Sequence, residues 1–326
     1  MTDTPILDVQ GLETHFFTKD GVAKAIDGVN FTVRKGEIMG LVGESGSGKS
    51  VTGFSILGLV DPPGKVVGGK VLFKGEDLLQ ADDKRMQELR GARISMIFQD
   101  PMMTLNPVLR VDTQMIETIQ AHEKVDKQTA WQRSRDALAQ VGIPSPEERM
   151  RAYPHQFSGG MRQRVAIAIA LLNKPDLIIA DEPTTALDVT IQGQILYETQ
   201  KLCRETGTAM IWVTHDLAVV AGLADSISVM YAGRVVEQGN INDVLDNPVH
   251  PYTLGLLGSV PGHNTRGQRL YQVPGMAPSL FKLPKGCAFQ PRCGYATEAC
   301  QQDQTVTEPV PGRAVRCCHP QVEVSS

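Results

Sequence analysis

A glycine-rich loop between an apolar run and a helical pattern constrains the fold of this chain more than any other part of its sequence. The loop consists of Gly43, Glu44, Ser45, Gly46, Ser47, Gly48, Lys49 and Ser50. Residues 39–42 before it are apolar or glycine, which is typical of a short buried strand, and residues 50–57 have apolar side chains at helical spacing. The loop therefore predicts an α/β protein in which a strand leads directly into a helix.

The chemistry that this loop supports is anion binding. Glycines let the backbone turn tightly enough for consecutive N–H groups to point at one anion, and a helix that begins near Lys49 adds about half a positive charge. In this motif the lysine, Lys49, reaches the β- and γ-phosphates of a nucleotide, and the hydroxyl of Ser50 binds Mg²⁺. A plain Gly/Ser-rich turn is the alternative, but the flanking strand and helix favour a phosphate site in an ATPase or GTPase.

An acidic pair follows a second apolar run. Asp181 and Glu182 come directly after residues 177–180, which are all apolar. Buried parallel strands have such continuous runs, and their last side chains emerge at the ligand edge of the sheet. One carboxylate there can hold Mg²⁺ through water, and the next can orient or deprotonate the attacking water. An isolated Asp-Glu pair would indicate a solvated turn, but the phosphate loop upstream favours a catalytic role.

A third segment lies between these two. It consists of Ser158, Gly159, Gly160, Met161, Arg162 and Gln163. The residues that follow, up to Leu172, are rich in alanine and isoleucine and predict a well-packed helix, with the serine and glycines capping its N-terminus. A capped helix N-terminus with exposed amides is another anion site.

The three segments in this order resemble the nucleotide-binding subunit of an ATP-binding-cassette (ABC) transporter, and the resemblance covers residues from about 5 to 260. It implies an ATPase with a P-loop NTPase cassette: a RecA-like core sheet, an antiparallel β subdomain and a helical subdomain. The core is expected at residues 1–103 and 153–260, the helical subdomain at 104–152, and a Cys-rich C-terminal extension at 261–326.

The resemblance also implies roles for residues outside the three segments. Phe16 would stack on adenine, with its neighbour Phe17 as the alternative, and Gln99 would sense Mg²⁺ and signal to the membrane partner. Asp188 would lie in a dimer-contact loop, and His215 would contact the γ-phosphate. Taken singly, a glutamine before Asp-Pro indicates a turn and a histidine after a strand indicates a structural role. In the family the 158–163 segment, here with Phe157 in place of leucine, completes the site of a partner cassette, so that two ATP molecules lie between two chains.

Composition predicts a chain that depends on other subunits for transport. The chain has 326 residues and a net charge of −4, and no stretch approaches the roughly 18 apolar residues that a membrane span needs. Its N-terminus lacks a basic segment followed by an apolar one, so no signal peptide is expected. No concentrated basic stripe suggests nucleic acid. We therefore expect a peripheral protein on the cytoplasmic face of the cell (inner) membrane, with the pore formed by two transmembrane permease subunits.

The proline-punctuated segment Asn247 to Thr253 narrows the family. A plain linker is the alternative, but the segment resembles the tail motif of the oligopeptide, dipeptide and nickel importer branch. That branch implies a periplasmic or extracellular solute-binding protein and a second ATPase subunit, identical or different, with di- or oligopeptides as cargo. Nickel, glutathione or another small solute remains an alternative cargo. A soluble ABC ATPase of DNA repair or translation would show a coiled coil, a zinc hook or two cassettes, and an exporter would lack this segment.

Five of the six cysteines lie in the C-terminal extension: Cys287, Cys293, Cys300, Cys317 and Cys318. Cys203 stands apart and is expected to be buried. In the reducing compartment that supplies ATP, clustered cysteines favour metal binding over disulfides, although their spacing fits no common zinc template. Four thiolates could hold zinc or an iron–sulfur cluster, and unmetallated thiols remain a third alternative.

Residues 286–296 resemble the tails of peptide-importer ATPases, for which a [4Fe–4S] cluster is implied. Matching the family's Cys-His pair selects Cys318, before His319, as the fourth ligand after Cys287, Cys293 and Cys300, and leaves Cys317 as the spare.

Local patterns predict further elements. Strands are expected at residues 6–9 and 28–33, amphipathic helices at 113–121 and 128–141, and a hairpin at 231–239 with Ala-Gly at its turn. Residues 144–148 are expected to interrupt the helices.

Overall fold

The computed structural model describes residues 4–184, 189–260 and 272–322. The chain forms two compact units, each described here by itself. The first unit comprises Met1–Ile6, Val33–Ile38 and Gln80–Trp212, and the second comprises Leu7–Thr32, Met39–Leu79 and Val213–Ser326.

An antiparallel sheet opens the second unit, with the strand order β2-β1-β4-β5. Its strands are β1 (Leu7–Thr18), β2 (Gly21–Val33), β4 (Gly64–Phe73) and β5 (Glu76–Asp77). The expected antiparallel β portion is therefore present, but β1 and β2 are longer than the predicted strands. Buried residues alternate with more exposed ones along both strands. The apolar runs in the sequence therefore cover only part of each strand.

The phosphate loop of the second unit joins a buried strand to a helix, as the sequence predicts. Strand β3 (Ile38–Val42) is buried throughout, and α1 (Lys49–Ile56) begins at the lysine of the loop. Strand β3 lies parallel to β9 (Ser226–Tyr231), with Val42 opposite Val229. The predicted hairpin is also confirmed: β9 and β10 (Arg234–Asn240) are antiparallel, and Ala232 and Gly233 turn with φ values of 47° and 83°, as a type I′ turn requires. Helices α8 (Leu217–Leu223), α9 (Ile241–Asp246) and α10 (Pro251–Gly258) complete this part.

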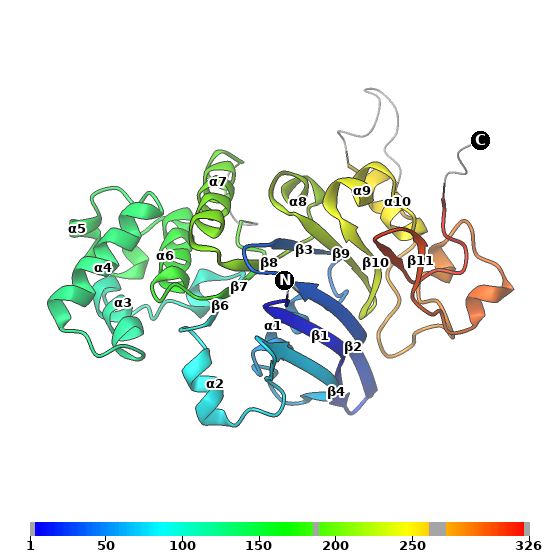
Figure 1. The fold of residues 1–326 in the computed structure, drawn as a ribbon, viewed down its shortest axis with the longest axis horizontal. Coiled ribbons are helices and arrows are strands. Elements are labelled where there is room, and N and C mark those ends of the chain that lie inside the picture. The colour runs from blue at the N-terminus through cyan, green and yellow to red at the C-terminus, as the bar shows by residue number, and fades with distance from the viewer. Residues whose placement is uncertain (1–3, 185–188, 261–271, 323–326) are drawn as a thin grey trace. The chain divides into compact units, whose positions relative to one another are not determined.

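The C-terminal extension packs onto the same sheet. Strands β11 (Thr307–Val310) and β12 (Arg313–Val315) form a hairpin, and β12 pairs antiparallel with β10 (Figure 1). A buried ion pair fixes it, because Arg313 Nη1 donates to Glu237 Oε1 at 2.8 Å. The Glu237 carboxylate also accepts from the backbone N–H groups of Val249 and His250, both at 2.9 Å. A buried carboxylate is tolerated only with such partners.

The first unit contains three adjacent strands of a sheet. They are, in order across the sheet, β6 (Ile94–Ile97), β7 (Leu177–Asp181) and β8 (Ala209–Thr214). Strands β6 and β7 are parallel, with Ile97 opposite Ala180, and every residue of β7 and β8 is buried. Helices α2 (Asp83–Leu89) and α7 (Val189–Thr206) belong to this unit as well.

Four helices of the first unit share a hydrophobic core (Figure 1). They are α3 (Val111–Gln120), α4 (Lys127–Gln140), α5 (Pro146–Met150) and α6 (Gly159–Leu171). The two predicted amphipathic helices are confirmed as α3 and α4. The expected interruption at residues 144–148 is confirmed only in part: α4 ends at Gln140 and residues 144 and 145 separate the helices, but Pro146 begins α5 at a position where a proline leaves no helical hydrogen bond unmade.

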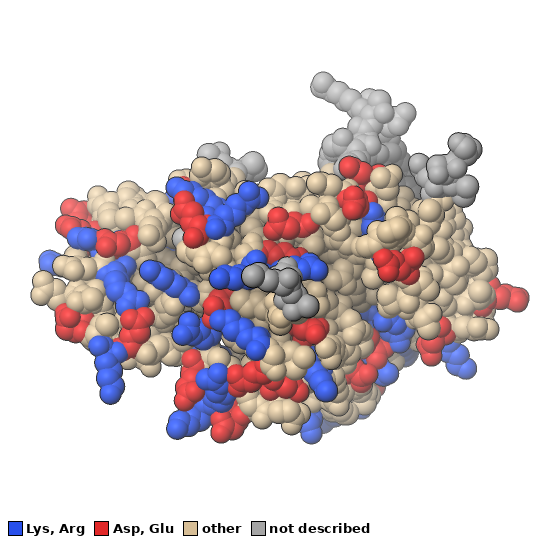
Figure 2. Space-filling view, viewed as in Figure 1, with Lys and Arg blue, Asp and Glu red and all other residues tan. Residues whose placement is uncertain are grey.

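The face of the protein drawn in Figure 2 carries acidic and basic side chains interspersed among its described residues. None of the helices within the described ranges is both long enough and apolar enough to cross a membrane.

Candidate functional site

Three glycines of the phosphate loop adopt conformations that other residues avoid. The φ values of Gly43, Gly46 and Gly48 are 156°, 78° and 104°. A Cβ atom at Gly43 would lie 2.2 Å from the carbonyl oxygen of Met230, and one at Gly48 would lie 2.5 Å from that of Ala25. The loop therefore keeps its shape because glycine lets it press against the backbone of neighbouring strands.

The polar groups of the loop fit a phosphate. Lys49 is only 5% exposed, and its Nζ donates to the carbonyl oxygens of Gly43 at 2.8 Å and Glu44 at 3.0 Å. The buried Oγ of Ser47 has no hydrogen-bond partner among the described residues. Buried polar groups are rarely left unsatisfied, so this hydroxyl is available to an anion at the start of α1.

Two residues from the C-terminal part of the second unit hold Glu44, and sequence reasoning missed both roles. The backbone N–H of Glu44 donates to the hydroxyl of Tyr252 at 2.9 Å. Its carboxylate accepts from Arg292 Nη1 at 2.7 Å and from Nη2 at 3.0 Å. Burial raises the pKa of Tyr252, and the hydrogen bond to Glu44 raises the pKa of Arg292, so the phenol stays neutral and the guanidinium stays charged. The 247–253 segment contains Tyr252, but no pattern in the sequence indicates a contact between this tyrosine and the loop.

In the first unit the structure brings Gln99 and Glu182 together. Strands β6 and β7 are parallel neighbours, so the residues after their carboxyl ends meet at one edge. Gln99 Nε2 donates to Glu182 Oε2 at 3.2 Å, and Asp181 is buried at the end of β7. Glu182 has a φ of 44°, a left-handed conformation that is uncommon outside glycine, and strained residues of this kind cluster at functional sites.

The 158–163 segment begins α6 as predicted, with one correction. Ser158 is the N-cap, and its Oγ accepts from the backbone N–H of Met161 at 3.3 Å. Gly159 and Gly160 belong to the helix and do not cap it, since the helix starts directly after the serine. Gln163 is buried, and its Nε2 has no partner within the part of the chain that the structure describes.

The remaining predicted residues lie at separate positions. His215 is exposed directly after β8 and belongs to the second unit. Phe16 lies on β1, where a Cβ added at Gly64 would be 2.7 Å from its ring, while the next residue, Phe17, is 49% exposed. Asp188 lies outside the described residues.

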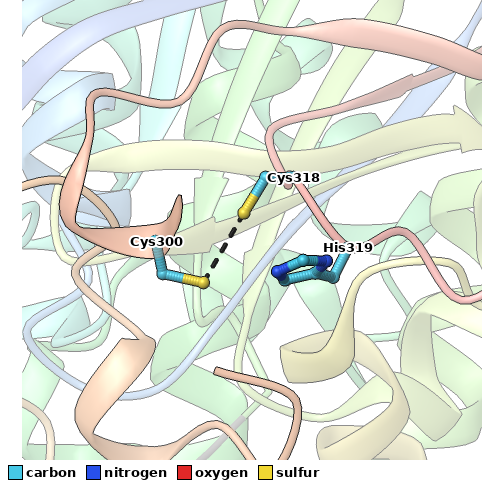
Figure 3. A group of neighbouring side chains, drawn as sticks. All are labelled: Cys300, Cys318 and His319. Atoms are coloured by element: carbon cyan, nitrogen blue, oxygen red, sulfur yellow. Dashed lines mark hydrogen bonds between the residues drawn. The ribbon is translucent and has the colours of Figure 1, made fainter. Parts of the chain in front are cut away.

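All five cysteines of the extension line one cavity in the second unit, together with His319. The Sγ atoms of Cys300 and Cys318 are 3.5 Å apart, and ligand atoms of Cys300, Cys318 and His319 lie within 4.8 Å of one another (Figure 3). Sulfur and imidazole donors in this arrangement suit zinc, iron or an iron–sulfur centre. Sequence reasoning used His319 only to select Cys318 and did not predict it as a ligand.

Burial controls the thiols of this cavity. It raises the pKa values of Cys287 and Cys293, and raises that of Cys317 to about 12. These groups are protonated at neutral pH unless a cation replaces the protons, so metal binding here would release protons. Cys203 is buried in α7, as expected.

Comparison with known proteins identifies the family. The family described as "ABC transporter" matches residues 26–185, and "Oligopeptide/dipeptide transporter, C-terminal region" matches residues 236–300. The oligopeptide transport ATP-binding protein OppD of Escherichia coli K12 is 49% identical over 98% of this chain and 94% of its own length. This chain belongs to the ABC transporter family. The dipeptide transport ATP-binding protein DppD of Bacillus subtilis is 51% identical over 91% of the chain and 89% of its own length.

Solved structures confirm the predicted cassette fold. The dimeric bacterial ABC transporter cassette MJ0796 matches with a TM-score of 0.66 and 27% identity, over 72% of this chain and 98% of that one. The cbiO1 protein from Clostridium perfringens matches with a TM-score of 0.63 and 30% identity, over 74% and 91% of the two chains.

The glycine geometry of the phosphate loop generates a paired test. Gly43→Ala should weaken MgATP binding because its Cβ would collide with the Met230 carbonyl, whereas Gly46 has no atom within 4 Å of its Cβ position. Gly46→Ala should cost only the conformational free energy of about 1–2 kcal/mol that a left-handed backbone imposes on a residue with a Cβ atom. Equilibrium binding of MgATP should be at least about tenfold weaker for Gly43→Ala than for Gly46→Ala, a difference of about 1.4 kcal/mol. Equal affinities would contradict the steric argument.

Proposed function

We propose that this chain is the ATP-hydrolysing subunit of a binding-protein-dependent ABC importer that energises uptake of peptides across the cytoplasmic membrane. The observation that carries the proposal is similarity along nearly the whole chain to oligopeptide and dipeptide transport ATP-binding proteins. The C-terminal region that matches the oligopeptide/dipeptide family supports peptides as the cargo class.

In this proposal the phosphate loop holds the triphosphate of ATP. Lys49 exchanges its carbonyl partners for the β- and γ-phosphates, and the amides from Gly43 to Ser50 surround them. Phe16 stacks on the adenine. Ser50, Gln99 and Asp181 are the proposed holders of Mg²⁺, which would neutralise phosphate charge.

Glu182 is the proposed catalytic carboxylate, and it orients or deprotonates the attacking water. Gln99 supports this role because it already donates to Glu182 and can report occupancy of the site. His215 is proposed to contact the γ-phosphate.

The proposed unit of function is a pair of cassettes. The capped start of α6, from Ser158 to Gln163, is exposed at Ser158 and Gly159 and would bind the nucleotide of a partner ATPase subunit, and Asp188 would contact that partner. ATP binding then closes two cassettes, and hydrolysis reopens them. The helical segment 104–152 would contact two transmembrane permease subunits, which receive the peptide from an external solute-binding protein. The chain would thus work as a peripheral subunit on the cytoplasmic face of the membrane.

We further propose that the cysteine cavity holds a metal centre, with a [4Fe–4S] cluster preferred and Cys287, Cys293, Cys300 and Cys318 as its ligands. The convergence of these four thiols on one cavity supports the proposal. A metal centre would stabilise the extension, as structural metals do in small domains with little core of their own.

Affinity purification from the native host tests the proposed assembly. The tagged chain should be recovered with two membrane-spanning proteins and a second cassette ATPase, and ATP hydrolysis by the complex should rise when a peptide-loaded binding protein is added. Recovery of the chain alone, or with DNA-repair or ribosomal proteins, would refute the importer assignment.

The catalytic role of Glu182 predicts a trapped state. Glu182→Gln keeps the size of the side chain and removes its charge, so ATP should still bind while turnover falls by about 10²-fold or more, the range lost with a general base. Steady-state hydrolysis and gel filtration with MgATP should show little phosphate release and a stable pair of cassettes. Hydrolysis near the parental rate would remove Glu182 from this role.

The cysteine cavity predicts iron in protein purified without oxygen. Iron and acid-labile sulfide should be found near four each per chain, as a [4Fe–4S] cluster requires, and Cys300→Ser should lose both. Cys203→Ser is the matched control, since Cys203 lies on α7 in the other unit and should keep full iron content. Colourless, iron-free protein with full activity would refute the cluster.

A further inference from the structure

We infer that Arg292 is a positioning residue of the ATP site: it immobilises and neutralises the Glu44 carboxylate, so that the C-terminal extension completes the phosphate loop of its own chain. This inference rests on the proposed function, because it assumes that the loop binds ATP. Arg292 would touch neither substrate nor metal and would act only through Glu44.

The geometry of the pair is specific. Arg292 uses Nη1 and Nη2 for the two carboxylate oxygens of Glu44, at 2.7 and 3.0 Å, which is the bidentate arrangement that arginine forms with carboxylates. Its side chain is 6% exposed, against 30% for Glu44. Exposed ion pairs contribute little, but a pair with one partner buried and both hydrogen bonds made fixes the position of the carboxylate.

Arg292 is itself held in place on every side. Its Nε donates to the carbonyl oxygen of Pro274 at 2.8 Å, and Nη1 also donates to the hydroxyl of Tyr231 at 3.3 Å. The guanidinium lies 5.8 Å from the ring centroid of Tyr231 and 6.0 Å from that of Phe289. The rings of Phe289, Tyr231 and Tyr252 pack together at 4.6–5.4 Å between centroids. The arginine is therefore preorganised before Glu44 meets it.

Every polar group of Glu44 is thereby assigned. Tyr252 accepts from its N–H, Lys49 donates to its carbonyl oxygen, and Arg292 binds its carboxylate. Residues 252 and 292 lie far from residue 44 in sequence, so the extension and the segment before it determine the shape of the loop's first turn.

Charge gives this contact a consequence for ATP. Glu44 is an anion within a loop whose amides and lysine would bind phosphate. The Debye length is roughly 8 Å at physiological ionic strength, so two negative charges closer than this repel each other. Arg292 cancels that charge. Without the arginine, Glu44 would oppose the nucleotide and compete for Lys49.

The test measures KM and kcat for MgATP in the purified complex, and the Kd of MgATP for the purified full chain. Arg292→Met should raise KM and Kd by about tenfold, because the partly exposed Glu44 carboxylate is left without its counter-charge beside the phosphates, while kcat changes less than about twofold. Glu44→Gln alone removes the anion and keeps the Arg292 charge, so KM should fall and not rise. The double variant Arg292→Met with Glu44→Gln should return to within about threefold of the parental KM, because the unbalanced charge is gone.

Arg316→Met is the matched control, since Arg316 also lies in the extension but donates to the carbonyl oxygen of Gln304 and not to Glu44. It should leave KM unchanged. Should Arg292→Met fold poorly, Arg292→Lys serves instead: it keeps the charge but loses the bidentate fork, so KM should rise by a smaller factor and Glu44→Gln should again remove the rise.

Two outcomes would overturn the inference. One is a parental KM and Kd in Arg292→Met; the other is a double variant as weak as Arg292→Met, which would show that the arginine acts through folding alone. Failure of the proposed function has a different result, namely a parental complex that binds MgATP but does not hydrolyse it. Equilibrium binding still tests Arg292 in that case, because it requires no turnover.

Discussion

The phosphate loop depends on one constraint: its backbone must press against neighbouring strands closely enough to exclude any side chain at Gly43 and Gly48. Strand β9 lies parallel to β3 and brings the carbonyl of Met230 against Gly43. Because no Cβ atom fits at Gly43, the loop can follow this path only with glycine at that position. The shape of the loop is thus a property of the adjacent strands as much as of the loop itself.

Buried charge organises the C-terminal part of the second unit. Glu237 is fully buried and accepts from Arg313 and two backbone amides, which ties the extension to β10. Glu44 accepts from Arg292, which ties the extension to the phosphate loop. In the first pair both charges are buried, and in the second the buried charge is Arg292, so each pair would leave a costly unpaired charge if the extension did not dock. The extension is therefore joined both to β10 and to the phosphate loop.

Sequence patterns predicted the elements with strong local signals. The strand and helix around the loop, the helices α3 and α4, the cap at Ser158 and the Ala232-Gly233 turn all follow from apolar periodicity and from the conformations that particular residues favour. Prediction was poorer where burial is one-sided or where helices are short. Strands β1 and β2 extend well past their apolar runs, and α5 begins at a proline that resembles a break.

The sequence by itself determined the family and the cassette fold, and it predicted the phosphate-binding and acidic segments, because each is a contiguous motif whose chemistry is local. Only the tertiary structure decided that Gln99 meets Glu182, that five cysteines and His319 share one cavity, and that Tyr252 and Arg292 hold Glu44. These contacts join residues tens to hundreds of positions apart. No local pattern encodes which buried arginine will meet which carboxylate, since strand order and packing bring them together.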